Sequence, residues 1–308
     1  PSKVTDNKYT NTDEYIANLQ MSGGDDLVRA WLLGDWNVLS GAFFREWDAT
    51  KHVIKSFAIP KNWTRFMSMD WGSARPFSVG WWCVVPDDVD FGAHTRIHSW
   101  IDQSPVKLPK GSIIRYREWY GAPKDRNGLT VPNVGLKLTA EEVARGIWLR
   151  EADEPRNENN RPRISYRAAD PSMFKEDGGP SHAERMGAYP YYIQLQRADN
   201  TRAGRNGAMG GWDAVRQRLK GEDGRPMIYF MDSCPEAIRT LPALQHDEDK
   251  MEDVDTDGED HCPDEIRYAC MSRPYSRPIQ DDYMREYIKR KENTHGIVFR
   301  DELFTIEE

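Results

Sequence analysis

The chain has 308 residues, of which 38% are hydrophobic and 11% aromatic, and a formal net charge of -8 at pH 7. This composition excludes a disordered chain and allows one large buried core. No stretch approaches the roughly 20 apolar residues that cross a bilayer, and the polar start lacks a signal-peptide core, so we expect a globular cytoplasmic protein without a membrane segment. The four cysteines are widely spaced without a Cys-x-x-Cys pair, which predicts reduced structural thiols rather than disulfides or a zinc finger.

Residues 1–60 are predicted to be a linker segment that packs on a larger domain, residues 61–308. The linker segment opens with two short amphipathic stretches, at 12–21 and 25–33, that favour helices. The aromatic residues that follow, Phe43-Phe44-Arg45-Glu46-Trp47, are typical of a segment that packs on another surface.

The larger domain begins with three alternating runs, at 65–85, 94–101 and 112–120, which predict an antiparallel meander. A helix capped by Thr139 then reaches about residue 150, and a polar loop leads into a strand that stops at Asp170. Helices and strands alternate beyond it: helices at 182–186, 212–219, 235–240, 264–271 and 280–291, strands at 191–195 and 227–230. Three antiparallel strands, a helix, and then parallel strands with helices predict an α/β ribonuclease H-like fold, with a mixed central sheet flanked by helices.

Two of these strands stop on a carboxylate. Asp70 lies in Met69-Asp70-Trp71-Gly72 and Asp170 in Ala169-Asp170-Pro171-Ser172. Because the first and fourth strands of this fold run side by side, the two carboxylates are expected within a few ångströms, where they repel each other unless a divalent cation lies between them. Taken singly, each could instead be an ordinary turn residue.

Charge is distributed unevenly along the rest of the chain. Residues 185–220 hold seven basic and two acidic residues, whereas residues 247–265 hold eleven acidic residues and one lysine. The Gly-rich loop with Arg197, Arg202 and Arg205 could hold phosphates of any DNA sequence. The alternative is a solvated surface loop.

Taken together, the motifs resemble those of the C-terminal nuclease domain of the large terminase subunit of tailed bacteriophages. The resemblance covers most of the chain. It is carried by Gly34-Asp35-Trp36, the aromatic run at 43–47, the Asp70 and Asp170 motifs, Glu252-Asp253-Val254-Asp255-Thr256, and Asp260-His261-Cys262-Pro263-Asp264-Glu265-Ile266-Arg267-Tyr268.

The resemblance implies that Asp70 and Asp170 are the first two metal-binding acids and that the segment from Asp260 to Asp264 supplies the third. Asp260 is favoured as the catalytic ligand, and Asp264 stays open as the alternative. His261 could support the ligands. Glu118, at the end of the third strand, could do so too or could face solvent.

The expected activity is metal-dependent endonucleolytic cleavage of concatemeric double-stranded DNA, with two Mg²⁺ or Mn²⁺ ions and little sequence preference. The implied partners are a packaging ATPase domain, the small terminase subunit and the portal, in an infected bacterial host cell. No Gly-x-x-x-x-Gly-Lys-[Ser/Thr] loop occurs, so we expect a fragment or a subunit without its motor. The alternatives are another ribonuclease H-like nuclease, of the resolvase or transposase type, and a non-catalytic DNA-binding or portal-docking module.

Overall fold

The computed structural model describes residues 42–86, 97–204, 209–222, 224–247, 253–256 and 258–275. The helices predicted at 12–21, 25–33 and 280–291 lie outside the described residues, as does Arg205. No described helix is long and apolar enough to cross a membrane.

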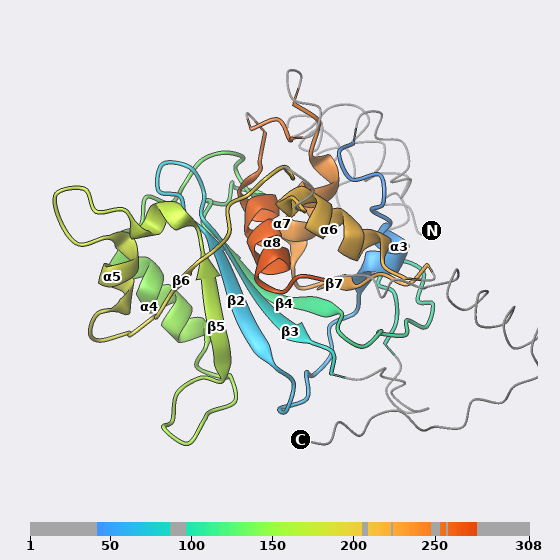
Figure 1. Cartoon of the computed structure of the whole chain (residues 1–308), viewed down its shortest axis with the longest axis horizontal. Coiled ribbons are helices and arrows are strands. Elements are labelled where there is room, and N and C mark those ends of the chain that lie inside the picture. The colour runs from blue at the N-terminus through green and yellow to red at the C-terminus, as the bar shows by residue number, and fades with distance from the viewer. Residues whose placement is uncertain are drawn as a thin grey trace, which may run out of the picture. The chain divides into compact units, whose positions relative to one another are not determined.

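Within the described residues, a seven-stranded mixed sheet forms the centre (Figure 1), with the strand order β1-β7-β4-β3-β2-β5-β6. The strands are β1 (Val53–Ile54), β2 (Arg65–Asp70), β3 (Ser78–Val84), β4 (Ile113–Tyr120), β5 (Ile164–Ala169), β6 (Gln196–Arg197) and β7 (Ile228–Met231). β2, β3 and β4 form antiparallel pairs, whereas β1 with β7, β4 with β7, β2 with β5, and β5 with β6 are parallel. The predicted mixed sheet, with its antiparallel meander followed by parallel strands, is confirmed.

Helices cover both faces of this sheet. They are α3 (Ala49–His52), α4 (Ala140–Arg150), α5 (His182–Gly187), α6 (Gly211–Lys220), α7 (Pro235–Thr240) and α8 (His261–Ser272), with 3₁₀ turns η3 (Pro171–Phe174) and η4 (Leu241–Ala243). α4 starts at a capping box, in which Thr139 and Glu142 satisfy each other's backbone N–H groups. α4 and α5 pack on one face and α6, α7 and α8 on the other (Figure 1).

Two predicted strands are wrong. The run at 65–85 holds both β2 and β3, which pair as a hairpin around Gly72 and Pro76, so the second strand of the meander is not at 94–101. The described part of that segment makes only isolated bridges, such as Ser99 with Ile54. The strand predicted at 191–195 is also absent, because Tyr192 has a left-handed backbone (φ 52°) that interrupts an extended run; the strand β6 starts at Gln196.

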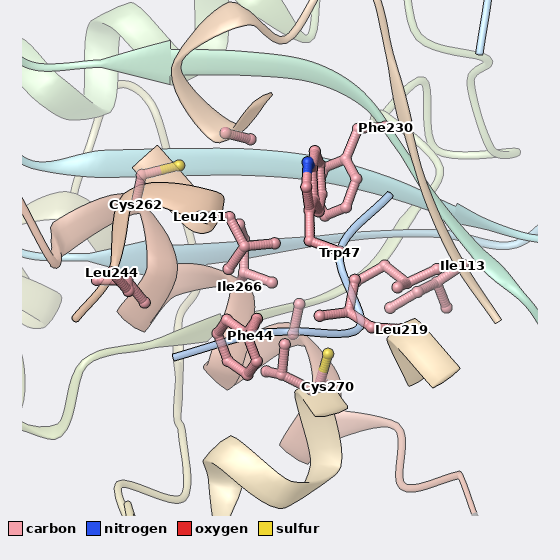
Figure 2. Close-up of a cluster of buried hydrophobic side chains, with 14 of the residues drawn as sticks. Phe44, Trp47, Ile113, Leu219, Phe230, Leu241, Leu244, Cys262, Ile266 and Cys270 are labelled. Atoms are coloured by element: carbon pink, nitrogen blue, oxygen red, sulfur yellow. The ribbon is translucent and has the colours of Figure 1, made fainter. Parts of the chain in front are cut away.

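The largest part of the core lies between the sheet and α6, α7 and α8 (Figure 2). Cys262, Ile266 and Cys270 lie four residues apart on α8 and share this core, as expected for one face of a helix. Yet residues 262–270 of α8 are all buried, so its charged side chains must find partners inside the protein. All four cysteines are buried and unpaired, so they pack as small apolar side chains.

Candidate metal centre

Asp70 and Asp170 come from neighbouring parallel strands and lie at the same edge of the sheet. Asp70 is the last residue of β2, and Met69 pairs with Ala169 in β5. The next backbone N–H, that of Asp170, donates to the Met69 carbonyl over 2.9 Å. The predicted juxtaposition of the two strand ends is therefore present in the structure.

Asp170 is held by the turn that follows β5. Its carboxylate accepts a 2.9 Å hydrogen bond from the Ser172 backbone N–H and another from the Ser172 hydroxyl. Asp170 is thus also the N-cap of η3. The alternative interpretation, in which Asp170 is a turn residue, is therefore correct as well. The cap fixes the direction of the carboxylate beside Asp70.

The first turn of α8 brings a third group of polar side chains to this edge. His261 Nδ1 lies 3.0 Å from Asp70 Oδ2 and donates to the ionised carboxylate. His261 Nε2 is buried and has no hydrogen-bond partner among the described residues. Asp260 is the N-cap of α8, but its side chain makes no capping bond. His261 therefore touches a predicted ligand, while the carboxylate of Asp260 is not committed to capping its own helix.

Burial and crowding of negative charge perturb these carboxyls. Burial, together with the charges of Asp264 and Asp170, raises the pKa of Asp70 to about 7, although the His261 hydrogen bond opposes the rise. Burial and the charge of Asp264 raise the pKa of Asp260 to about 6. Burial alone would lower the pKa of His261, but Asp70, Asp260 and Asp264 raise it. The pKa values of Asp70 and Asp260 are therefore both raised by burial and by the charge of Asp264.

Asp264 differs from Asp260 because its charge is already compensated. Its carboxylate lies 3.1 Å from a guanidinium nitrogen of Arg202 and 2.9 Å from Nε of Arg267. Arg267 is fully buried and also donates to Asn200 over 2.7 Å. Asp264 therefore resembles a structural ion-pair partner, whereas Asp260 is the less compensated of the two acids.

Glu118 is buried, so the expectation that it could face solvent is wrong. Its side chain is 6% exposed, and it accepts hydrogen bonds of 2.7 and 3.1 Å from the backbone N–H groups of Glu236 and Ala237. These are the first N–H groups of α7, where a carboxylate satisfies unpaired donors and the helix dipole. Burial raises the pKa of Glu118 to about 7, while nearby Arg115 and the two N–H groups oppose the rise.

The two described arginines of the predicted DNA-binding loop differ in their surroundings. Arg197 is exposed at the end of β6, next to Ala169 in the sheet, and its guanidinium lies 5.1 Å from the Phe174 ring centroid. Arg202 is bound to Asp253 at 2.8 Å as well as to Asp264. Arg197 is thus open to a ligand, and Arg202 is largely occupied by the acidic residues.

Among the described residues, no three His, Cys, Asp or Glu side chains lie close enough together to hold a metal ion. The predicted ligands are nevertheless carboxylates, whose oxygen atoms are the donors that suit a hard divalent cation. Sequence reasoning did not identify the pairing of Asp264 with Arg202 and Arg267. The i, i+3 spacing of Asp264 and Arg267 was the one available signal.

Comparison with protein-family models and with curated proteins finds no match. Among solved structures, the chain is similar to the large terminase of the thermophilic bacteriophage D6E at 17% identity, with a TM-score of 0.50, over 89% of this chain and 55% of that one. The same protein in complex with ADP matches at 18% identity, with the same coverage and TM-score. The P22 large terminase nuclease domain matches at 15% identity over 79% of this chain and 97% of that domain, with a TM-score of 0.44.

The chain spans about half the length of the D6E large terminase. At this identity the similarity concerns the fold. The chain has a ribonuclease H-like fold of the kind found in phage large terminases, which confirms the predicted fold class and the resemblance seen in the motifs.

Proposed function

We propose that this chain is the nuclease part of a phage large terminase and cleaves double-stranded DNA in a divalent-metal-dependent reaction. The observation that supports this most is the meeting of Asp70 and Asp170, at adjacent parallel strand ends, with the start of α8, where His261 contacts Asp70. Crowded, buried carboxylates are costly unless a cation compensates them.

In this proposal Asp70, Asp170 and Asp260 hold the metal, with Asp264 as the alternative third acid. Two bound Mg²⁺ or Mn²⁺ ions would activate water and neutralise charge on the phosphate and the leaving oxygen. His261 orients Asp70 through the 3.0 Å contact, and the Ser172 cap orients Asp170. Exposed Arg197 would bind a phosphate of any DNA sequence.

The substrate we propose is concatemeric DNA, cut with little sequence preference during genome packaging in the cytoplasm of the infected bacterium. A packaging ATPase domain, the small terminase subunit and the portal would be the partners. Because the chain itself has a net charge of -8, weak DNA affinity is expected unless an ATPase assembly supplies DNA at high local concentration.

Plasmid cleavage with Mn²⁺ or Mg²⁺, and with EDTA, tests the proposal. Asp70→Asn and Asp170→Asn should each remove nearly all cleavage, since each loses a metal-binding charge and little volume. Asp153→Asn is the matched control, because Asp153 is 73% exposed and pairs with Arg117. The control should cleave like the wild type.

The outcomes separate the alternatives. Cleavage that survives excess EDTA, or that persists in both site variants, contradicts the metal-dependent site. DNA binding without cleavage in Mn²⁺ would favour the docking module, and a strong preference for branched DNA or strand transfer would favour a resolvase or transposase.

A further inference from the structure

One carboxylate of α8 enters a polar socket built by three strands of the sheet. Glu265 is 0% exposed. Its Oε1 accepts from the Ser68 hydroxyl of β2 and from the Trp82 indole N–H of β3 at 3.2 Å; its Oε2 accepts from Arg115 of β4 and from the Ser78 hydroxyl of β3 at 3.3 Å. The socket therefore supplies four donors to one side chain.

The backbone leaves room for this side chain at one position. A Cβ atom at Gly80, in the middle of β3, would lie 2.4 Å from Glu265 Oε1 and 2.8 Å from a guanidinium nitrogen of Arg115. Any larger residue at Gly80 would displace the ion pair. The space is thus shaped for the pair of Glu265 and Arg115 rather than for general packing.

The socket sets the position of α8 along β2. His261 and Glu265 are one helical turn apart and contact Asp70 and Ser68 respectively. Four helical residues rise about 6 Å and two strand residues about 6.6 Å, so both contacts fit together only in this alignment. A displaced Glu265 would carry His261 away from Asp70.

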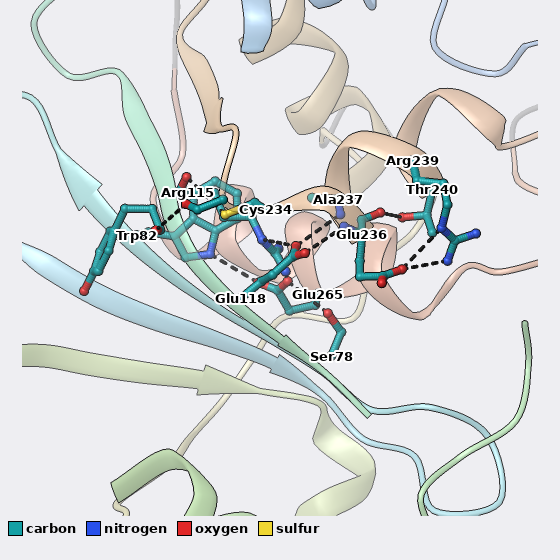
Figure 3. A network of polar contacts seen from close by, with 12 residues as sticks. Ser78, Trp82, Arg115, Glu118, Cys234, Glu236, Ala237, Arg239, Thr240 and Glu265 are labelled. Carbon is teal, nitrogen blue, oxygen red and sulfur yellow. Dashed lines mark hydrogen bonds and ion pairs between the residues drawn. The ribbon is translucent and has the colours of Figure 1, made fainter. Parts of the chain in front are cut away.

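Arg115 connects the socket to a second anchor near the site (Figure 3). Its Nε lies 3.5 Å from Glu118, which caps α7. On α7, Glu236 binds Arg239 at 2.8 Å, and Arg239 also lies 3.0 Å from Glu259. Glu259 directly precedes Asp260. The network therefore holds α8 both within its second turn and just before its N-cap.

We propose that Glu265 and Arg115 are positioning residues that hold the start of α8, with Asp260 and His261, at the end of β2, where His261 contacts Asp70. The proposal rests on the proposed function in one respect, that these acids bind metal. A buried ion pair is often no more stabilising than apolar residues of similar size, so stability alone does not account for so directional a socket. Removing a residue that orients a metal ligand commonly weakens metal binding by about 10- to 100-fold.

The test variant replaces both members of the pair, Arg115→Met with Glu265→Met, so that neither is left buried without the other, while Glu118 keeps its two hydrogen bonds from the N–H groups of α7. The control is Arg65→Met with Glu154→Met. That pair is equally buried, with side chains 5% and 4% exposed and a 3.2 Å separation, but Arg65 is at the opposite end of β2 from Asp70. Both proteins are crystallised without metal and titrated with Mn²⁺ by calorimetry.

We expect the test variant to fold, to lose the 3.0 Å contact between His261 Nδ1 and Asp70 Oδ2, and to bind Mn²⁺ at least 10-fold more weakly than the wild type. The control variant should keep both this contact and the wild-type affinity for Mn²⁺. A test variant that keeps the contact, or that binds Mn²⁺ like the wild type, overturns the positioning role. If the wild type itself binds no Mn²⁺, the proposed function fails, while the metal-free distance still decides whether Glu265 and Arg115 position α8. Should the double variant not fold, Ser68→Ala, which removes one donor from the socket, is judged by the same two measurements.

Discussion

Replacing Asp70 by Asn is expected to stabilise the metal-free protein at pH 8 while abolishing its response to metal. Burial raises the pKa of Asp70 from its ordinary value of 3.8 to about 7 in the folded protein. Between these two values the folded protein holds a proton that the unfolded chain has released, so stability falls as the pH rises through this window. Asn cannot ionise and avoids that loss.

The size of the effect follows from the two pKa values. A rise of about three pH units in the pKa of Asp70 corresponds to about 4 kcal/mol at pH 8, and this is a ceiling that is reached only if Asn packs as well as the protonated carboxyl. For a protein of this size, 1 kcal/mol moves the Tm by roughly 2 °C, so the ceiling is about 8 °C. At pH 5, little more than one pH unit above 3.8, the same calculation gives about 1.6 kcal/mol or about 3 °C, so the difference in Tm between the two proteins should be less than half of that at pH 8.

Thermal unfolding in EDTA at pH 5 and pH 8 measures this difference, with and without later addition of excess Mn²⁺. The wild type should gain Tm with Mn²⁺ at pH 8, because the cation binds the folded, ionised site, and Asp70→Asn should gain little. Asp153→Asn, at an exposed ion pair, should show neither effect. If Asp70→Asn melts below the wild type at pH 8 in EDTA, the reasoning about crowded carboxylates is refuted.

Two further predictions concern DNA contact and the core. Replacing Arg197 and Arg205 by Ala should weaken binding equally for unrelated DNA sequences and lower the salt slope by roughly 0.9 for each lost phosphate contact. Arg202 is left in place because it pairs with Asp253 and Asp264. An unchanged slope in filter-binding or anisotropy titrations would mean that the loop is only a solvated surface. Ile266→Ala, in the fully buried core of α8, should cost about 2–5 kcal/mol in urea unfolding, whereas Leu149→Ala, at a side chain 52% exposed, should cost about 0.5 kcal/mol or less.

Local signals were sufficient to predict where Asp70 and Asp170 lie. Each follows an apolar run and precedes Gly or Pro within two residues, which indicates the end of a strand. The order of elements then placed the two strands side by side. The same kind of reasoning failed at residues 191–195, because the left-handed backbone of Tyr192 depends on the tertiary setting rather than on the local pattern.

The ion-pair network could not be predicted from the sequence. Arg115 and Glu265 are separated by 150 positions, and their contact depends on how α8 crosses β2, β3 and β4. Glu118 was misread for the same reason, since its partners are the N–H groups of α7, more than 110 residues away. A charged residue is usually exposed, and its burial can be predicted only when the distant residue that pairs with it is known.

The third acid of the site can be identified by comparing stability with cleavage. Asp264 is paired with Arg202 and with fully buried Arg267, so Asp264→Asn leaves buried positive charge under-compensated and should cost roughly 3 kcal/mol. Asp260 makes no capping bond and its pKa is raised to about 6 by burial and by Asp264. Asp260→Asn should therefore melt at or above the wild-type temperature at pH 8 in EDTA, yet lose nearly all Mn²⁺-dependent plasmid cleavage. Asp264→Asn should melt lower but retain more cleavage at a temperature at which it stays folded. The opposite pattern, with stable but inactive Asp264→Asn and active Asp260→Asn, would make Asp264 the metal-binding acid and leave Asp260 as a helix-start residue only.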